Sequence, residues 1–136
     1  DVSVQAQILN LITELQKRHG YGYLFISHDL AVVRHLSHRI AVMYLGRIVE
    51  TCPTEGLFTR PLHPYTRALL AAIPRPDPAL RQDLAPVSGD VPSPVHLPTG
   101  CPFHPRCPES MARCRAVPPE TLEPEPDHFV DCHLYG

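Results

Sequence analysis

Four cysteines in the last third of the chain are the residues whose chemistry stands out first. They are Cys101, Cys107, Cys114 and Cys132, with the spacing C-x5-C-x6-C-x17-C. Prolines within residues 100–108 restrict the backbone, which lowers the entropy lost when thiolates converge on one centre. Three interpretations are open from the residues alone: a disulfide frame, a metal site or an accidental clustering.

A metal site fits the character of this segment. A stretch so short and rich in proline cannot bury a core of its own, so a metal centre would contribute the missing stability. Four thiolates suit tetrahedral zinc or an iron–sulfur cluster, although structural zinc sites usually show closer pairs than these. His104, His128 and His133 are nearby substitute ligands. Cys52, by contrast, has no partner nearby and is interpreted as a small residue in a turn.

Composition excludes several classes of function. A formal net charge of -2 on 136 residues creates no broad field for nucleic acid or anionic lipid, so we expect no nucleic-acid partner. The sequence shows no long apolar run and no secretory leader, which favours the cytoplasm, where thiols stay reduced. Of 17 prolines, most follow residue 73, so the chain looks like the end of something larger.

The first part of the chain alternates between helical and strand patterns. Residues 1–20 predict an amphipathic helix that ends at Gly20, and residues 21–27 form the short apolar run of a strand buried in a parallel sheet. A second helix opens at His28-Asp29. The apolar face of the first helix consists of Val4, Ile8, Leu11, Ile12 and Leu15.

The next part predicts a hairpin followed by two helices. Residues 39–45 form a strand, Gly46-Arg47 a tight turn, and residues 48–50 the returning strand. Helices are expected at residues 54–58 and 65–73, with a proline near the first turn of the second. The proline-rich stretch that follows, up to residue 98, is expected to be an extended, partly stiff connector.

This order of elements is typical of an α/β domain, but the chain supplies too few strands to flank a buried parallel one. The first half is therefore expected to be a piece of a larger α/β domain. His28 would lie at the carboxyl edge of the sheet, where ligands bind in open α/β folds. Position alone favours a simpler reading, in which Ser27 or Asp29 caps the next helix and His28 is a surface residue.

Residues 1–60 closely resemble the C-terminal half of an ABC-transporter nucleotide-binding domain. The resemblance implies that Asp1 ends the D-loop, at the interface between two ATPase domains, and that His28 is the switch histidine that contacts the γ-phosphate of ATP. The phosphate loop, Walker B carboxylate, catalytic glutamate and signature motif are absent from this sequence. The chain alone is therefore predicted to be inactive, whereas its full-length parent would bind ATP and Mg and hydrolyse ATP.

Residues 61–76, PLHPYTRALLAAIPRP, resemble the H-P-Y-T-R-x-L-L motif of oligopeptide and dipeptide importer subunits. His63, Pro64, Tyr65 and Arg67 match this motif. We expect it to dock a helix, with Tyr65 and Leu69 packing inward, rather than to contact a ligand.

The cysteine-rich tail resembles the C-terminal extension of the same subfamily. That resemblance implies a [4Fe-4S] cluster on Cys101, Cys107, Cys114 and Cys132, with zinc as the alternative. A structural role for the cluster is favoured over a redox role, because the sequence carries no cofactor site or motif for an electron partner. A sensor that disables uptake on oxidation is a further alternative.

The fold class expected is α/β: the C-terminal half of a P-loop (ABC-type) nucleotide-binding domain, then a small, irregular, metal-stapled extension. We expect an ABC ATPase portion at 1–60, the motif helix and connector at 61–98, and the cluster-binding extension at 99–136. The alternatives from other classes are a non-catalytic regulatory metal-binding module and a redox electron carrier.

The function implied is that of a fragment of the ATP-binding subunit that powers peptide uptake by an ABC importer. The implied partners are transmembrane permease subunits, a second ATP-binding subunit and, indirectly, a substrate-binding protein. The implied location is peripheral, at the cytoplasmic face of the membrane. The sequence does not choose between dipeptides, longer peptides and nickel as the imported ligand.

Overall fold

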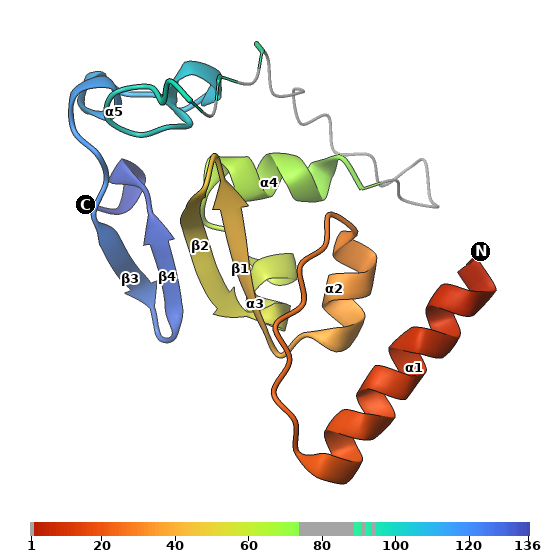
Figure 1. Cartoon of the computed structure of the whole chain (residues 1–136). Helices are drawn as coiled ribbons and strands as arrows, with labels where there is room; N and C mark the ends of the chain where they lie inside the picture. Colours follow the sequence, from red (N-terminus) through yellow and green to blue (C-terminus); the bar gives the residue numbers. More distant parts are fainter. Residues whose placement is uncertain (1, 74–88, 91, 94) are drawn as a thin grey trace, which may run out of the picture. The chain divides into compact units, whose positions relative to one another are not determined.

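The computed structural model describes residues 2–73, 89–90, 92–93 and 95–136 (Figure 1). Asp1 and most of the expected connector lie outside these described residues. The chain divides into two compact units, Asp1–His38 and Arg39–Gly136.

The first unit contains the two helices that the sequence predicts. Helix α1 spans Val2–His19 and ends at Gly20, which has φ of +69° and donates its N–H to the carbonyl of Gln16 at 2.8 Å. Glycine favours this left-handed conformation because it lacks a Cβ. Helix α2 spans Leu30–Leu36.

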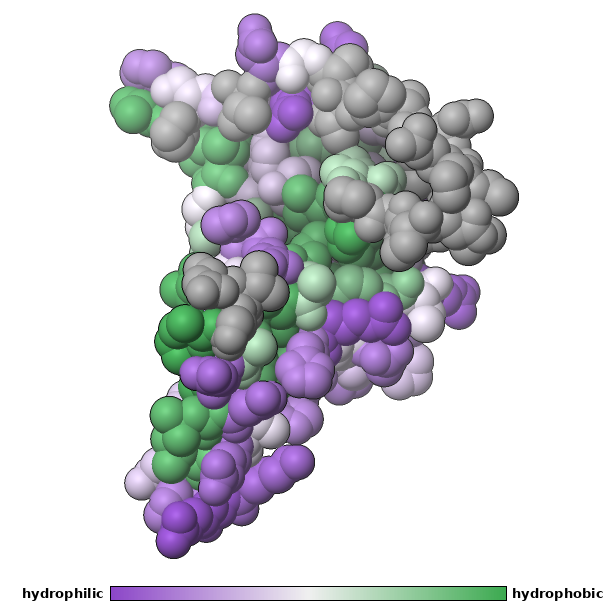
Figure 2. Space-filling view, turned by 90° about the vertical axis from the view of Figure 1, so that its right-hand side faces the viewer, coloured by the Kyte–Doolittle hydropathy of each residue, from purple (hydrophilic) through white to green (hydrophobic). Residues whose placement is uncertain are grey.

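The expected strand at residues 21–27 is wrong. The segment has no regular secondary structure, and Leu24 and Ile26 are 92% and 89% exposed. A strand exists only where its backbone pairs with a neighbour, and no strand is described in this unit. In Figure 2, apolar and hydrophilic residues lie side by side over the lowest part of the view, where α1 is found. The predicted apolar face of α1 is accordingly half exposed at Val4, Ile8 and Leu11.

The second unit contains a four-stranded sheet in the order β1-β2-β4-β3, and every pair in it is antiparallel. The strands are β1 (Arg39–Tyr44), β2 (Arg47–Pro53), β3 (Thr121–Glu125) and β4 (His128–Asp131). The expectation of a parallel sheet therefore does not hold in the described chain, whose fold is a mixture of helices and an antiparallel sheet.

The turn between β1 and β2 forms one residue earlier than the sequence pattern predicts. Leu45 and Gly46 occupy it, with φ of +46° and +78°. Two consecutive positive φ values match the twist of a two-residue hairpin, and glycine accepts such a value without strain. The hairpin itself is confirmed.

Strands β3 and β4 come from the tail, where the sequence predicts no strand. β4 pairs with β2, with Val130 opposite Glu50 and Phe129 opposite Thr51. Asp127 turns the chain between β3 and β4 with φ of +62°. The tail is consequently part of the same sheet as the hairpin.

Helices α3 (Thr54–Thr59) and α4 (Pro64–Ala71) confirm the two helices expected after the hairpin. The tail adds α5 (Ala112–Ala116) and two short 3-10 helices, η2 (His104–Arg106) and η3 (His133–Tyr135). Much of the core is aromatic: the ring of Phe103 contacts the rings of Tyr44, His63 and Tyr65. This cluster joins β1, the start of α4 and the loop that follows Cys101.

Replacing Gly46 by alanine should destabilise the hairpin through backbone strain alone. A Cβ at this position would meet nothing within 4 Å, but φ is +78°. We expect Gly46→Ala to lower the free energy of unfolding by about 1–2 kcal/mol, measured by urea denaturation. Gly56→Ala is the matched control, because Gly56 is helical and its added Cβ would make ordinary contacts. Equal stabilities of the two variants would contradict the assignment of strain to the turn.

Candidate functional site

His28 lies immediately before α2, between two residues that shape the backbone. The hydroxyl of Ser27 accepts the N–H of Asp29 at 3.0 Å, and the Asp29 carboxylate accepts the N–H groups of Ala31 and Val32 at 3.0 and 3.2 Å. Asp29 thus caps α2, as one alternative of the simpler interpretation proposes, whereas Ser27 binds the backbone of Asp29 before the helix begins. His28 itself is exposed. Its part in nucleotide chemistry stays a prediction, as does the interface role of Asp1.

Glu50 is a fully buried carboxylate at the centre of the second unit, with 1% of its surface exposed. One oxygen, Oε1, accepts the N–H of Leu62 at 2.8 Å and lies 2.7 Å from Nε2 of His128. The other, Oε2, accepts the N–H of His63 at 2.9 Å. Three donors satisfy the carboxylate, which is the condition under which a protein interior tolerates such a charge.

His63 caps the N-terminus of α4. Its Nδ1 accepts the N–H of Tyr65 at 3.0 Å, and Pro64 fills the first turn, where no N–H is needed. Burial lowers the pKa of His63 to about 4; the negative charge of Glu50 opposes this shift and the positive charge of Arg67 adds to it. The ring is therefore neutral at pH 7, with Nδ1 as an acceptor.

Arg67 connects the motif to the tail. Its guanidinium donates to the carbonyls of Pro61 and Leu62 at 3.2 and 2.9 Å, to the hydroxyl of Tyr135 at 3.0 Å and to Glu109 at 2.8 Å. A planar group with five donors suits such a convergence of acceptors.

The contacts of the H-P-Y-T-R motif agree with the expectation that it docks a helix. Tyr65 and Leu69 are both half-buried, and the Tyr65 ring packs on Tyr44 and Phe103.

The four tail cysteines are all free thiols, and three of them are buried. The N–H of Cys101 donates to the carbonyl of Cys114 at 2.8 Å. This close approach requires Gly100, which has φ of +72° and whose added Cβ would lie only 2.3 Å from that carbonyl oxygen. The loop and α5 are thereby held together beside the thiols.

The thiols lie close enough to influence one another's ionisation. Burial, together with the charges of Cys101, Cys107 and Cys114, raises the pKa of Cys132 to about 11. Burial also raises the pKa of Cys101 and of Cys107, and each is raised again by Cys114. A group of thiols that oppose each other's ionisation is a place where a bound cation would be favourable.

The thiols nevertheless do not lie at the spacing of a single-ion site. Among the described residues, the group of ligand atoms mutually within 4.8 Å is Glu50, Cys52 and His128. The tail thiols form no such group. Around one zinc ion, with Zn–S about 2.3 Å, the sulfurs would be about 3.8 Å apart.

The three histidines considered as substitute ligands each make another contact. Nδ1 of His104 lies 2.9 Å from the carbonyl of Cys101, and Nε2 of His133 lies 2.8 Å from the carbonyl of Val117. His128 contacts Glu50.

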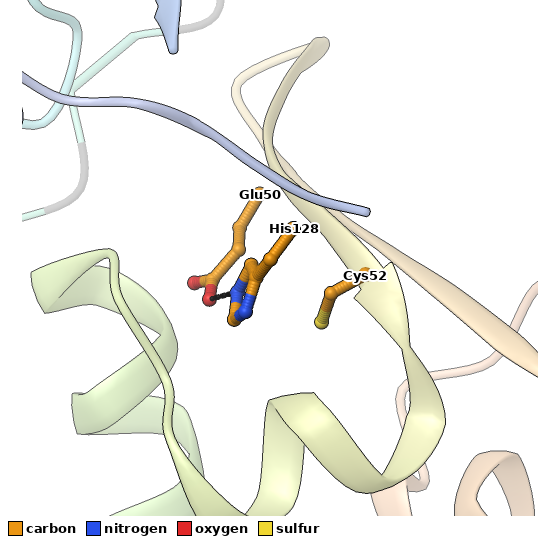
Figure 3. A group of neighbouring side chains, drawn as sticks. All are labelled: Glu50, Cys52 and His128. Carbon is orange, nitrogen blue, oxygen red and sulfur yellow. Dashed lines mark hydrogen bonds and ion pairs between the residues drawn. The ribbon is translucent and has the colours of Figure 1, made fainter. Parts of the chain in front are cut away.

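The interpretation of Cys52 as a turn residue without a partner is wrong. It lies in β2, is completely buried and neighbours Glu50 and His128 (Figure 3). Burial raises its pKa to about 11, and the charge of Glu50 contributes to this rise. Sequence reasoning missed this group because His128 is 78 residues from Glu50. A local signal existed only in β2, where Glu50 and Cys52 are two positions apart and so share a face of the strand.

Comparison with known proteins supports the resemblance seen in the sequence. Residues 49–114 match the family described as "Oligopeptide/dipeptide transporter, C-terminal region". The chain is 61% identical over 136 residues to a probable peptide ABC transporter ATP-binding protein, y4tS, of Sinorhizobium fredii, covering 98% of this chain and 38% of that protein. It is 52% identical over 137 residues to the putative oligopeptide transport ATP-binding protein YkfD of Bacillus subtilis, covering 99% and 42%.

These matches make the chain similar to ATP-binding proteins of peptide ABC transporters, and residues 49–114 similar to the C-terminal region of oligopeptide/dipeptide transporters. A third relative, the oligopeptide transport ATP-binding protein AppF of Bacillus subtilis, is 49% identical over 138 residues, covering 100% of this chain and 42% of that protein. The chain spans about two fifths of the length of these relatives. None of the described helices is both long and apolar enough to cross a membrane.

The buried, neutral state of His63 predicts a loss of stability in acid. The folded pKa is about 4 and the ordinary value is 6.5, so the unfolded chain takes up the proton first as the pH falls. The neutral His63 ring contributes fully to the free energy of unfolding above pH 6.5, and this contribution is lost as the pH falls toward 4. Between these values the free energy of unfolding should drop by about 3 kcal/mol more in the wild type than in His63→Asn, which keeps a capping acceptor but does not titrate.

Urea denaturation at several pH values from 7 to 4 measures this difference. Parallel pH dependences for the wild type and His63→Asn would show that His63 is not the group responsible.

Proposed function

We propose that this chain is the C-terminal portion of the subunit that hydrolyses ATP to power peptide uptake by an ABC importer. The observation that carries the proposal is the similarity of nearly the whole chain to peptide-transporter ATP-binding proteins, at 49–61% identity. The docked H-P-Y-T-R motif supports it, because the residues that match the family are those that make the buried contacts of α4.

In the parent subunit, ATP with Mg would bind to residues outside this chain, and two residues of this chain would take part. His28 would contact the γ-phosphate, for which its exposure and its capped, ordered backbone are suitable. Asp1 would lie at the interface with a second ATP-binding subunit. Transmembrane permeases would couple ATP hydrolysis to transport, and a binding protein would deliver the peptide. The subunit would be peripheral on the cytoplasmic face of the membrane.

The same proposal assigns a role to each of three parts of the chain. Residues 1–60 would complete the ATPase domain, residues 61–98 would carry the docking helix and the connector, and residues 99–136 would hold the metal centre. The pairing of β4 with β2 supports this division, in which the extension would pack against the end of the ATPase portion.

We further propose a [4Fe-4S] cluster on Cys101, Cys107, Cys114 and Cys132, with zinc as the alternative. Burial and the neighbouring thiols raise the pKa of Cys101, Cys107 and Cys132, and a cationic centre would stabilise their thiolates. Four thiolates suit an iron–sulfur cluster as well as tetrahedral zinc. When bound, the cluster would supply a rigid cross-link, and the residues themselves would fix the loop, α5 and the start of η3 around it.

Mutation of His28 tests the ATPase role in the full-length subunit assembled with its permeases. We expect His28→Ala to lower ATP hydrolysis and peptide uptake by about 100-fold or more, because a group that contacts the transferring phosphoryl is lost. His35→Ala is the matched control, since His35 is also exposed but lies on α2. Unchanged hydrolysis in His28→Ala would contradict its role, and uptake of nickel instead of peptide would contradict the proposed substrate.

Analysis of iron and acid-labile sulfide tests the cluster, using anaerobically purified chain. We expect about four of each per chain, and their loss in Cys114→Ser. Cys52→Ser is the control, because that thiol lies outside the proposed cluster and should leave iron and sulfide unchanged.

About one zinc without sulfide would replace the cluster by the zinc alternative. If the wild type contains no iron, no zinc and no sulfide, both the cluster and the zinc alternative are overturned.

A further inference from the structure

A second group of metal-ligating side chains lies apart from the four cysteines of the tail. Glu50, Cys52 and His128 each offer one ligand atom, and these three atoms lie within 4.8 Å of one another. The side chains are 1%, 0% and 3% exposed. Figure 3 shows them converging from β2 and the start of β4, above the turns of α3.

The ligand types match a borderline divalent cation. Thiolate, imidazole and carboxylate are the three ligand classes that zinc uses, at about 2.3, 2.0–2.1 and 2.0–2.2 Å. Two such atoms bound to one tetrahedral zinc ion are about 3.4–3.6 Å apart. The three atoms lie within 4.8 Å of one another, so side-chain shifts of about 1 Å would bring them around the ion.

The charges also balance. A bound Zn²⁺ would be neutralised by the Glu50 carboxylate and the Cys52 thiolate, with His128 neutral, so no net charge would be buried. Binding would release the Cys52 proton and would move the His128 ring proton from Nε2 to Nδ1, exchanging the 2.7 Å contact with Glu50 for the ion. A proton-bearing thiol and a hydrogen bond are thus replaced by three metal bonds.

The surroundings hold the carboxylate in place for this role. Glu50 keeps two backbone donors, the N–H groups of Leu62 and His63 at 2.8 and 2.9 Å. Such hydrogen bonds orient ligating carboxylates in metal sites. The neighbouring position in α3 is Gly56, whose missing Cβ would lie 3.8 Å from Nδ1 of His128 and 3.9 Å from Sγ of Cys52.

We propose that Glu50, Cys52 and His128 form a second metal site, which binds a single Zn²⁺ ion through Sγ, a ring nitrogen and a carboxylate oxygen. The ion would join the hairpin strand β2 to the tail strand β4, in addition to the backbone pairing between them. The site differs from the tail cysteines in its ligands and in its spacing, and it does not depend on what those cysteines hold.

Zinc binding to the purified full chain tests the proposal, with Zn²⁺ alone as the probe. The zinc content of Cys52→Ser should be one ion per chain lower than that of the wild type. Cys107→Ser, which alters a half-buried tail thiol outside the Leu62–Val130–Cys132 cluster, should keep the Cys52-dependent ion. Added Zn²⁺ should raise the melting temperature of the wild type and of Cys107→Ser, but not that of Cys52→Ser. Equal zinc content in folded wild type and folded Cys52→Ser would overturn the proposal.

X-ray absorption at the zinc edge provides a readout that does not require any variant to fold. We expect the zinc-loaded wild type to show nitrogen and oxygen ligands together with sulfur. A zinc coordination shell made only of sulfur would place all the zinc on the tail cysteines and would overturn the proposed site at Glu50, Cys52 and His128. A wild type that binds no zinc at all would overturn it equally, and Glu50 and His128 would then be a buried pair only.

Discussion

The hydrogen bonding of the Glu50 carboxylate is the constraint on which the second unit depends. Its partners come from separate parts of the chain: the N–H groups of Leu62 and His63, and the His128 ring at the start of β4. A buried carboxylate is tolerated only while these donors are present. Removal of one partner from a buried pair of this kind typically costs about 3–5 kcal/mol, because the remaining group is left uncompensated. The hairpin, the entry to α4 and the tail are therefore stabilised together.

The tail depends on this arrangement more than on any core of its own. Val130 packs with Leu62 and Cys132 in a small buried cluster, and the Tyr135 hydroxyl donates to the Leu62 carbonyl at 2.9 Å. Arg67 contacts Tyr135 and Glu109. These contacts attach the tail to α4 and the loop before it without any metal. A cluster on the four cysteines would then rigidify a segment that is already docked.

The two groups of potential ligands illustrate how spacing separates metal chemistries. The tail thiols influence one another's ionisation but are not a described group of three ligand atoms mutually within 4.8 Å. Glu50, Cys52 and His128 form such a group and carry mixed ligand types. The proposed cluster would use thiolates alone, whereas the proposed single ion would use one thiolate, one imidazole and one carboxylate. Both lie in the unit that contains the β2–β4 pairing, so either metal would strengthen the connection between hairpin and tail.

Local signals in the sequence determined the elements that need no distant partner. These signals act within a few residues of the chain: the apolar period of residues 4–15, the Asp29 cap, the glycine of the hairpin turn and Pro64 at the start of α4. The helices and the hairpin form where these signals predict them. The strand expected at residues 21–27 failed because a strand requires a neighbouring strand, which the described chain does not provide. The sequence does not predict the tail strands β3 and β4, because they are short and β3 contains proline. Only the tertiary structure brought His128 to Glu50 and Cys52, since side chains 78 residues apart leave no periodic trace and meet only when β4 pairs with β2.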